Sequence, residues 1–444
     1  MKLRGLTCAV LAVGMSYAAG ASAQEQVWLK DRRYGEGIGI RAGDFELHPG
    51  IGGEFGYDSN YFLRSSNDDP APVDTLRLRI TPSFSVATIN RGRGEDGGAP
   101  EPPKVGFRAA VAGTYSEFIA LQSANSDQLS KQRNISGLAS LQLRILPGRP
   151  FGGDVYTDAL RSVQPSNDPT FNYNRFTARF GGGVTWAPGG GMFDWRLGYE
   201  YGLVYFEDRS FRGLSNESHI LNTRGRWRFL PRTAVLFDGS ASFLHYNQGP
   251  TGAQLDSNPI RARLGLNGLV TRQLALLAMA GWASSFYGGA NAQQFDGVVA
   301  QAELKWFITP GTGTELIGGP LPISTAALGY TRDFYNSYLG DFIARHRFYF
   351  TLSHLFAGRF LIVIDGSYSP IRYPTIYNPD RTFNHAGFTA PHVDASLFGE
   401  YRLSDSFGLN ATFRYSANIT DERVSLDYLG WNRYEAFLGV RWFL

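Results

Sequence analysis

The clearest chemical pattern in this sequence is a set of arginines at alternate positions. Arg224, Arg226 and Arg228 lie two residues apart, and the same spacing recurs in Arg77 and Arg79, Arg261 and Arg263, and Arg345 and Arg347. A guanidinium is permanently charged and offers several planar donors, so it pairs with carboxylates and phosphates and donates to hydroxyls. In an extended chain, residues two apart project on the same side, roughly 7 Å from each other. The spacing predicts rows of positive charge along β-strands.

Signatures of enzyme active sites are nearly absent. The sequence has no GxSxG elbow, no HExxH helix and no phosphate loop, and its one cysteine is Cys8. The nearest approach to a catalytic pair is His392 with Asp394, beside His385, which is reminiscent of the Asp/His sites of barrel hydrolases. A histidine near an aspartate in a loop arises often by chance. We therefore expect no catalytic residues, no metal site and no cofactor.

Composition excludes several classes of protein. A net charge of +3 over 444 residues is too small to indicate binding to nucleic acid. Beyond the first residues no stretch approaches the 18 apolar residues of a membrane helix. Membrane residence therefore requires β-strands. No linker rich in Pro, Ser or charge divides the chain, which favours one large body.

Alternation of apolar and polar residues recurs along the chain. We count about eighteen such segments (16 to 18) between residue 45 and the end, commonly 10 to 14 residues long, which is long enough for a tilted strand to cross a bilayer. One clear example runs from Phe193 to Tyr205, where Trp195, Leu197 and Tyr199 alternate with Asp194, Arg196 and Glu200. The pattern predicts an all-β fold with one apolar and one polar face on each strand.

The connections also alternate in length. Short turns such as PGRP (147 to 150), PGGG (188 to 191) and LSDS (403 to 406) interleave with long polar segments such as 207 to 218, 369 to 392 and 418 to 432. This asymmetry is typical of bacterial outer-membrane barrels, with short periplasmic turns and long extracellular loops. We predict a transmembrane antiparallel β-barrel of meander topology. The segments 91 to 104 and 309 to 322 are long on the side that should be short.

The two ends of the chain support export and closure. Residues 1–23 have the charged start, apolar middle and small-residue cleavage site of a signal peptide, cleaved near Ala23. We expect residues 24–44 to be a short periplasmic segment and residues 45–444 to form the barrel. The last strand, RYEAFLGVRWFL (433 to 444), would leave a free edge unless it pairs with the strand at 45 to 57. Its apolar row consists of Tyr434, Leu438, Val440, Trp442 and Leu444.

This terminal strand resembles the signal that barrel assembly machinery recognises, although Leu444 replaces the usual final Phe. Acidic substitution of Trp442 or Val440 should impair assembly, because both would face lipid. The same substitution at Arg441, on the opposite row, should be tolerated.

Assigning the apolar row to lipid places the arginines inside the barrel. The predicted pore-lining residues are Arg77, Arg79, Arg144, Arg175, Arg179, Arg224, Arg226, Arg228, Arg261, Arg263, Arg345 and Arg347, with the acids Glu200, Asp238, Glu303 and Asp365. Arg402 and Arg414, and the acids Glu46, Glu54, Asp194 and Glu400, fall on the same row. Such a lining favours anionic or hydroxyl-rich solutes. The alternative is that these arginines form ladders of salt bridges with acids on neighbouring strands and fill the lumen.

One stretch resembles a known family. GIGIRAGDFELHPGIGGEFGYDSNYF, residues 37 to 62, is similar to the start of porin-type outer-membrane β-barrels associated with bacterial exopolysaccharide export clusters, and LRLRITPSFSV (76 to 86) strengthens the likeness. The resemblance implies a barrel that carries a secreted polysaccharide across the outer membrane, supplied by a periplasmic polysaccharide co-export protein. Its other partners would be outer-membrane lipid and lipopolysaccharide.

Three classes of function remain open, of which we favour polysaccharide export. Polysaccharide export predicts a wide lumen lined by arginine and aromatic residues. A general or anion-preferring diffusion porin for small solutes predicts a narrowed lumen. A surface receptor or adhesin predicts that the long loops carry the function.

Overall fold

The computed structural model describes residues 39–66, 71–89, 104–163, 173–188, 191–247, 254–289, 291–308, 324–378, 382–420 and 429–444. The predicted signal peptide and most of the segment 24–44 lie outside these residues. Eighteen long antiparallel strands form the barrel. They are β2 (Phe45–Asp58), β3 (Thr75–Thr88), β4 (Val105–Ala120), β5 (Asn134–Ile145), β6 (Phe151–Ser162), β7 (Arg175–Trp186), β8 (Phe193–Phe206), β9 (Asn216–Leu230), β10 (Thr233–Tyr246), β11 (Ile260–Leu269), β12 (Leu274–Ser284), β13 (Asp296–Phe307), β14 (Ser324–Asn336), β15 (Phe342–Phe356), β16 (Phe360–Tyr373), β19 (Phe388–Arg402), β20 (Phe407–Asn418) and β21 (Trp431–Phe443).

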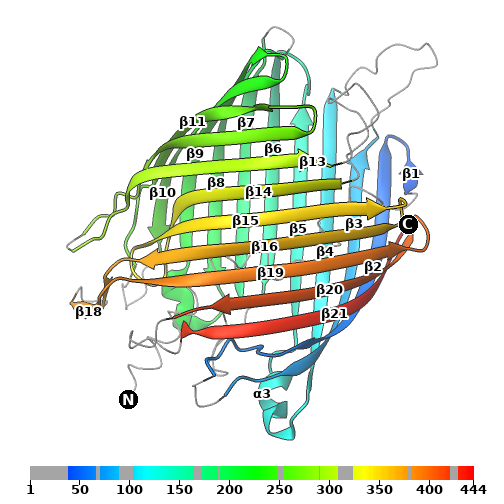
Figure 1. Ribbon diagram of the computed structural model, residues 1–444, viewed down its shortest axis with the longest axis vertical. Coiled ribbons are helices and arrows are strands. Elements are labelled where there is room, and N and C mark those ends of the chain that lie inside the picture. The colour runs from blue at the N-terminus through cyan, green and yellow to red at the C-terminus, as the bar shows by residue number, and fades with distance from the viewer. Residues whose placement is uncertain are drawn as a thin grey trace.

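The sheet closes on itself, as the C-terminal sequence predicts. Each strand pairs with the next along the chain, and β21 pairs with β2 in the register Gly50 with Phe443 through Asp58 with Glu435. The predicted all-β, 18-strand meander barrel is therefore confirmed. Figure 1 shows that β14 to β21 form a front layer whose strands run across those of β3 to β8 behind them.

A short strand completes the seam where the chain ends. Strand β1 (Ile40–Ala42), within the predicted N-terminal segment, folds back on Phe45–Leu47 of β2. It therefore occupies the edge of β2 just beyond the last residue of β21. The backbone N–H of Leu444 donates to the carbonyl of Pro49 at 3.0 Å. Together β1 and β21 cover this edge of β2, so it is not left open to another chain.

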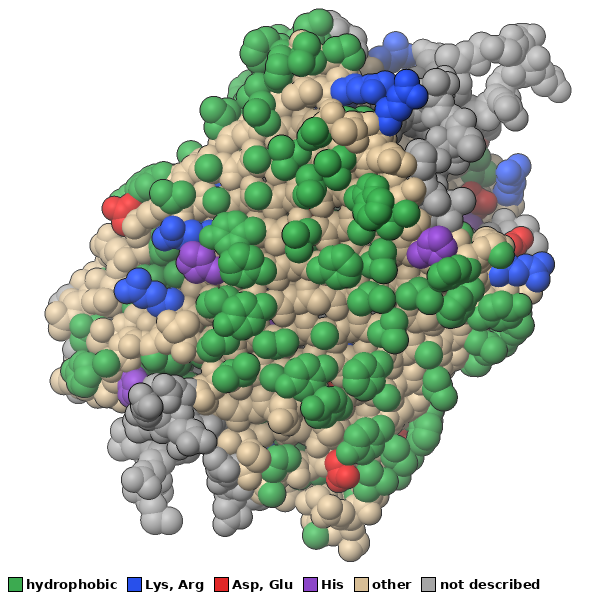
Figure 2. All heavy atoms as spheres, in the orientation of Figure 1, with side chains coloured by type: hydrophobic (Ala, Val, Ile, Leu, Met, Phe, Trp, Pro, Cys, Tyr) green, Lys and Arg blue, Asp and Glu red, His purple; other side chains and the backbone are tan. Residues whose placement is uncertain are grey.

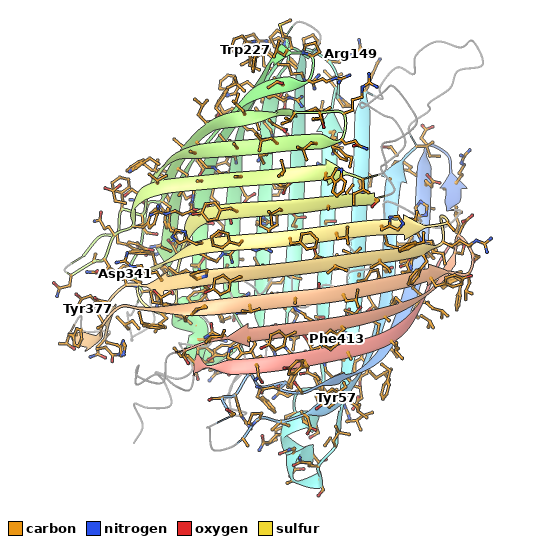
Figure 3. The ribbon with its side chains drawn as sticks, in the orientation of Figure 1. Tyr57, Arg149, Trp227, Asp341, Tyr377 and Phe413 are labelled. Atoms are coloured by element: carbon orange, nitrogen blue, oxygen red, sulfur yellow. The ribbon has the colours of Figure 1, made fainter. Side chains whose placement is uncertain are left out.

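The connections at the two ends of the barrel differ, as their lengths predict. At one end lie tight turns such as that between β15 and β16, where Ala357 and Gly358 both have positive φ. Two successive positive φ values define a type I′ turn, which matches the twist of a two-strand hairpin. Figure 3 places Arg149 at this turn end, and Asp341 and Tyr377 at the other end. We call the latter the loop end.

The loop end carries the small elements of the structure. They are the 3-10 turns η1 (Ser123–Asn125) and η2 (Arg209–Leu214), the helix α3 (Ser126–Ser130), and the hairpin of β17 (Ile376–Tyr377) with β18 (Phe383–His385). In contrast to the predicted rhythm of long loops, β14 and β15 are joined at this end by only Ser337–Asp341. In the described part of the chain no helix is long and apolar enough to span a membrane.

The outer face of the barrel is apolar. Leu264, Val184 and Leu438 are 62%, 63% and 71% exposed, although a soluble fold would bury such side chains. Figure 3 shows Tyr57, Trp227 and Phe413 pointing away from the barrel wall. In Figure 2 apolar side chains spread across the visible face, and charged ones gather toward its ends. This is the outward apolar band that a transmembrane barrel presents to lipid.

Candidate functional site: the arginine-lined lumen

The period of two divides each strand between lipid and lumen. On β21, Leu438, Val440 and Trp442 are exposed on the outer wall, whereas Arg441 and Phe443 are buried on the lumen side. Tyr434 also faces outward, and Leu444 follows the end of the strand. On this strand, the row that we predicted to face the lumen therefore lies opposite the exposed apolar row.

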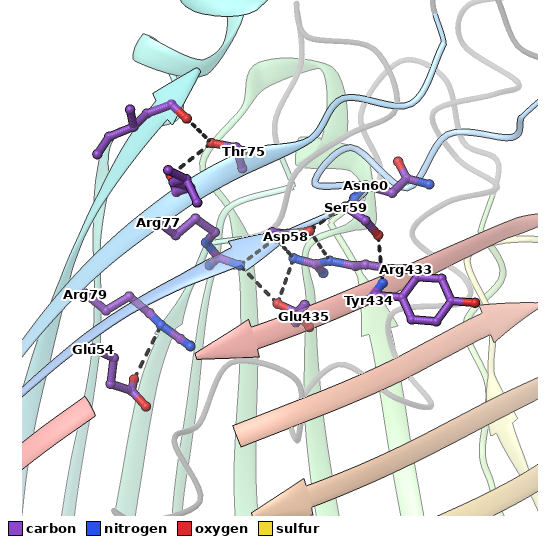
Figure 4. A network of polar contacts seen from close by, with 12 residues as sticks. Glu54, Asp58, Ser59, Asn60, Thr75, Arg77, Arg79, Arg433, Tyr434 and Glu435 are labelled. Atoms are coloured by element: carbon purple, nitrogen blue, oxygen red, sulfur yellow. Dashed lines mark hydrogen bonds and ion pairs between the residues drawn. The ribbon is translucent and has the colours of Figure 1, made fainter. Parts of the chain in front are cut away.

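The barrel seam is held by a network of charged side chains (Figure 4). Asp58 on β2 is fully buried and accepts hydrogen bonds from Arg77 of β3, at 2.8 Å, and from Nε of Arg433 of β21, also at 2.8 Å. Glu435 faces the same two guanidiniums at 3.1 and 3.0 Å. Two acids and two arginines thus neutralise each other where the first and last strands meet.

The seam network extends along the lumen and into the loop end. Nε of Arg79 lies 3.4 Å from a carboxylate oxygen of Glu54. Its guanidinium carbon stands 3.5 Å from the ring centre of Phe437. Beyond Asp58, Tyr61 packs against Phe118, and burial raises the pKa of its hydroxyl to about 12. The tyrosine therefore remains neutral at physiological pH.

A second set of ion pairs lines the wall from β6 to β11. Arg196 of β8 donates to both carboxylate oxygens of Asp154 of β6 at 2.8 Å. Arg263 of β11 forms the same fork with Asp238 of β10, at 2.9 and 2.8 Å. The remaining pairs on this wall join Arg226 to Asp194, Arg179 to Asp158, and Arg261 to Asp333 of β14. The salt-bridge ladder considered as an alternative is therefore present for these residues.

The ladder nevertheless leaves arginines in excess on this wall. Arg224 stands beside Arg196 of β8 and Asp238 of β10 in the strand register, but Asp238 is already held by Arg263. Arg224 is exposed, and within the described residues neither it nor Arg228 has an acidic partner. The guanidiniums of Arg224 and Arg228 are therefore free to meet a solute.

The other predicted residues fall into three groups. Three acids accept hydrogen bonds from hydroxyls: Glu200 from Tyr156, Glu303 from Tyr349, and Asp365 from Thr351, at 2.6, 2.6 and 2.7 Å. Two arginines lie over rings, Arg345 over Tyr335 and Arg347 over Tyr349, each 5.2 Å from the ring centre. Arg144 donates to Gln142 at 3.2 Å, and Arg175 is buried at the loop end of β7.

Sequence reasoning missed several members of the network. Arg196, Arg433 and Glu435 lie on lumen rows, so the alternation would have found them. Asp58 lies in the stretch 37 to 62 on which the family resemblance rests, and it was not among the predicted pore-lining residues. Its place opposite Arg433 depends on the closing register, which the sequence does not specify.

The His/Asp pair noted in the sequence is engaged in other contacts. Nε2 of His392 lies 3.3 Å from Asp394. Arg414, however, donates two hydrogen bonds to the same carboxylate, each at 2.9 Å. His385 belongs to β18 and packs edge-on against Phe388. Within the described chain, no three His, Cys, Asp or Glu side chains gather as metal ligands.

Apolar side chains from distant strands meet inside the lumen. One cluster joins Ala112 of β4 to Leu361 and Val363 of β16, Phe398 of β19 and Phe443 of β21. Leu138 of β5 and Leu355 of β15 pack against it, although these two strands lie on opposite sides of the ring. These contacts therefore join two opposite walls of the barrel. We call this set the cross-lumen cluster.

The loop end is also narrowed from within. Tyr338, on the connection between β14 and β15, packs against Phe206 of β8 and Tyr246 of β10, with ring centres 5.5 and 6.5 Å apart. Gln254 donates to the carbonyl of Tyr338 at 3.0 Å. Nearby, Tyr287 donates to Asn336 at 2.8 Å, and burial raises its pKa well above the ordinary value. The short connection therefore reaches across the ends of β11 to β13.

Comparison with known proteins supports a porin-type barrel. Residues 207–423 match the family model described as "Putative beta-barrel porin 2". The match covers slightly less than half of the chain and does not include residues 37 to 62, on which the sequence resemblance to exopolysaccharide-associated barrels rests. No curated protein matches the sequence.

Among solved structures, the chain is similar to OccAB4 of Acinetobacter baumannii, with 12% identity, coverage of 90% of this chain and 98% of that one, and a TM-score of 0.44. It is similar to OpdK of Pseudomonas aeruginosa, with 11% identity, the same coverage and a TM-score of 0.45. For a BenF-like porin from Pseudomonas fluorescens Pf-5, identity is 10%, coverage 90% and 99%, and the TM-score 0.47. At these scores the likeness adds nothing to the strand pairing described above. From the end of β8 through β20, however, the chain is similar to a family of β-barrel porins.

Proposed function

We propose that the protein is an outer-membrane channel of the porin type that lets small anionic or hydroxyl-rich solutes pass along the wall from β5 to β11. The apolar outer face suits a bilayer, and the polar inner face suits a water-filled path. The family match over residues 207–423 supports the same class of protein. Most charged lumen residues pair with one another or with hydroxyls, and the arginines without an acidic partner can bind a passing anion, so the role we propose is transport.

The observation that carries the proposal is the surplus of arginine on one wall. The acids there are already engaged: Asp154 by Arg196, Asp194 by Arg226, and Asp238 by Arg263. Arg224 and Arg228 stand four residues apart on the same face of β9 and have no acidic partner within the described residues. A carboxylate or phosphate passing this wall would meet two unengaged guanidiniums, which bind such groups through paired hydrogen bonds. The paired arginines are bound by acids of the wall, whereas the unpaired ones can bind the solute.

The width of the lumen distinguishes the two transport functions. Export of a polysaccharide predicts a wide lumen, whereas the cross-lumen cluster joins opposite walls by direct apolar contact. Tyr338 narrows the loop end as well. Both features favour a small solute. The support for export, with a periplasmic co-export protein as partner, is the sequence resemblance at residues 37 to 62.

Assembly of such a channel depends on its last strand. Strand β21 closes the barrel against β2 and ends with Trp442 and Phe443 on opposite faces. We propose that the barrel assembly machinery recognises this strand before closure, and that outer-membrane lipid covers its apolar row afterwards.

Uptake into vesicles tests the proposal. The purified barrel is placed in liposomes, and swelling rates are compared for a monosaccharide, a uronic acid of the same size, and an oligosaccharide of about ten sugars. We expect the uronate and the monosaccharide to enter, the uronate faster, and the oligosaccharide to be excluded. Entry of the oligosaccharide at a similar rate would favour polysaccharide export. Failure of all three to enter would favour a receptor or adhesin.

A further inference from the structure

A hollow opens on the outer wall of the barrel, at the loop end of β13 to β16. Its volume is about 540 Å³. The charged and histidine side chains on its lining are Arg332, His346, Arg372 and Asp296. Uncharged polar groups come from Gln293, Gln294, Thr375 and Thr389, and aromatic walls from Phe295, Phe342 and Phe388. None of these residues belongs to the lumen row predicted from sequence.

Strand parity places the basic side chains of this hollow on the lipid-facing side of the barrel wall. Arg332 shares its side of β14 with Leu328, which is 61% exposed. His346 shares its side of β15 with Phe348 and Phe350, both on the apolar outer wall. Figure 2 shows basic and histidine side chains close together over this end of β14 to β16, beside the apolar face.

The hollow exists because the strand ladders are interrupted here. Pro370 on β16 has no N–H to donate, and no residue pairs join β15 to β16 between the pair Arg345 with Ile371 and the pair Phe348 with Tyr368, although the register is the same on both sides of this gap. On the other side, pairing of β13 with β14 begins only at Ala300 and Arg332. The first residues of β13 therefore diverge from β14, and Phe295 stacks on Phe334 with ring centres 4.5 Å apart.

The hollow lies at the height of lipid headgroups. Tyr330 packs on Phe348 with ring centres 5.0 Å apart, as in the aromatic bands that mark a membrane interface. The tyrosine hydroxyl also lies 2.9 Å from Nδ1 of His346. Arg332 is two residues nearer the loop end than Tyr330, or roughly 7 Å along the strand. Its guanidinium therefore lies just beyond the aromatic band, where the phosphates of a bilayer are found.

The charged side chains of the hollow favour the binding of an anion. Within the described residues neither Arg332 nor Arg372 has an acidic partner, and the one acid on the lining, Asp296, is held by the indole N–H of Trp282. Unpaired arginines on a lipid-facing wall are costly unless an anion joins them. A phosphate would pair with both, and the amides and hydroxyls of Gln293, Gln294 and Thr375 suit the hydroxyls of a sugar.

We propose that this hollow binds the phosphorylated sugar headgroup of a glycolipid in the outer leaflet of the membrane, chemically the lipid A part of lipopolysaccharide. The acyl chains would lie along the apolar wall below it, over Phe348 and Tyr368. The site is separate from the lumen, so it stands whether or not the proposed transport function is correct.

Native mass spectrometry of the detergent-purified barrel tests this site. Bisphosphorylated lipid A is added to the wild type and to the double variant R332Q/R372Q, and the fraction of protein carrying one lipid is measured. We expect binding to the variant to be at least tenfold weaker. The matched control R232Q/R359Q also removes two arginines, but from short turns at the opposite end of the barrel. It should bind like the wild type.

Two further probes identify the ligand. Dephosphorylated lipid A should bind as weakly to the wild type as lipid A does to R332Q/R372Q, and millimolar inorganic phosphate should not displace the lipid. Equal binding by R332Q/R372Q and the wild type would overturn the proposal, as would tight binding of the dephosphorylated lipid. Displacement by inorganic phosphate would show a small-anion site instead. If the double variant does not fold, R372Q alone carries the test, because this exposed side chain is dispensable for packing, and roughly threefold weaker binding is then expected.

Discussion

Replacement of Asp58 by Asn tests whether the charged network holds the barrel seam. Asp58 and Glu435 together balance Arg77 and Arg433, and the side chains of these arginines are only 11% and 12% exposed. Asparagine retains the size of the side chain but leaves one positive charge without compensation. Breaking a buried ion pair by removing one partner costs about 3 to 5 kcal/mol. Because Glu435 still contacts both arginines, we expect a loss of about 3 kcal/mol in the free energy of unfolding, at the lower limit of that range.

The assay is reversible urea unfolding of the barrel in lipid vesicles, followed by tryptophan fluorescence. The control is Asp405→Asn, which removes an exposed carboxylate on the turn between β19 and β20 and should change stability by less than about 0.5 kcal/mol. The double variant D58N/R433Q should lose less than the two single variants together, because it removes the uncompensated charge. Equal stability of D58N and D405N would refute the role of the seam network.

Three other predictions concern the lipid face, the orientation and the lumen. Leu264→Arg, on the outer wall of β11, should lower stability by about 2 to 4 kcal/mol in the same urea assay, whereas Asn267→Arg on the lumen side of that strand should have little effect; equal losses would show that the parity is wrong. A cysteine replacing Ser210 in η2 should react with an impermeant maleimide on intact cells, and one replacing Ser404 on a short turn should not; the reverse labelling would invert the barrel. Phe398→Ala should raise single-channel conductance by opening the cross-lumen cluster, whereas Phe413→Ala on the outer wall of β20 should leave it unchanged; no increase would mean that the cluster does not limit conduction.

The sequence predicted the barrel because its main determinant is local. An alternation such as that of Trp195, Leu197 and Tyr199 requires only neighbouring residues, and it assigns the two faces of a strand. Closure followed from the same pattern, since an apolar terminal strand needs a partner.

The partners of each arginine were not predictable in this way. Arg263 and Arg224 both flank Asp238 in the structure, and only Arg263 binds it. Register, strand tilt and side-chain reach decide that choice, and none of them can be read from spacing alone.

One expectation drawn from the sequence is corrected by the structure. Arg441 lies on the lumen row as predicted, but tolerance of an acid there does not follow. Its guanidinium contacts Glu400, is 5% exposed, and lies over the ring of Phe443. An acid at this position would face Glu400 without a cation between them. We therefore expect Arg441→Asp to impair assembly as Trp442→Asp does, for electrostatic rather than lipid-facing reasons.

The narrowing of the lumen could not be predicted from the sequence either. Leu138 and Leu355 are more than two hundred residues apart, and their strands pair with different neighbours. Only the closed tertiary structure brings both into the cross-lumen cluster. This feature changed the preferred solute from a polymer to a small molecule.

The most direct test of the central claim is the reversal potential of the channel in a planar bilayer with a tenfold gradient of potassium chloride. The proposed arginine wall predicts that chloride is more permeant than potassium, and that R224Q/R228Q shifts the reversal potential toward zero. The two replaced arginines are those without an acidic partner within the described residues, so the ion pairs of the wall remain intact. A wild-type channel that prefers potassium, or a reversal potential unaffected by R224Q/R228Q, would contradict the account.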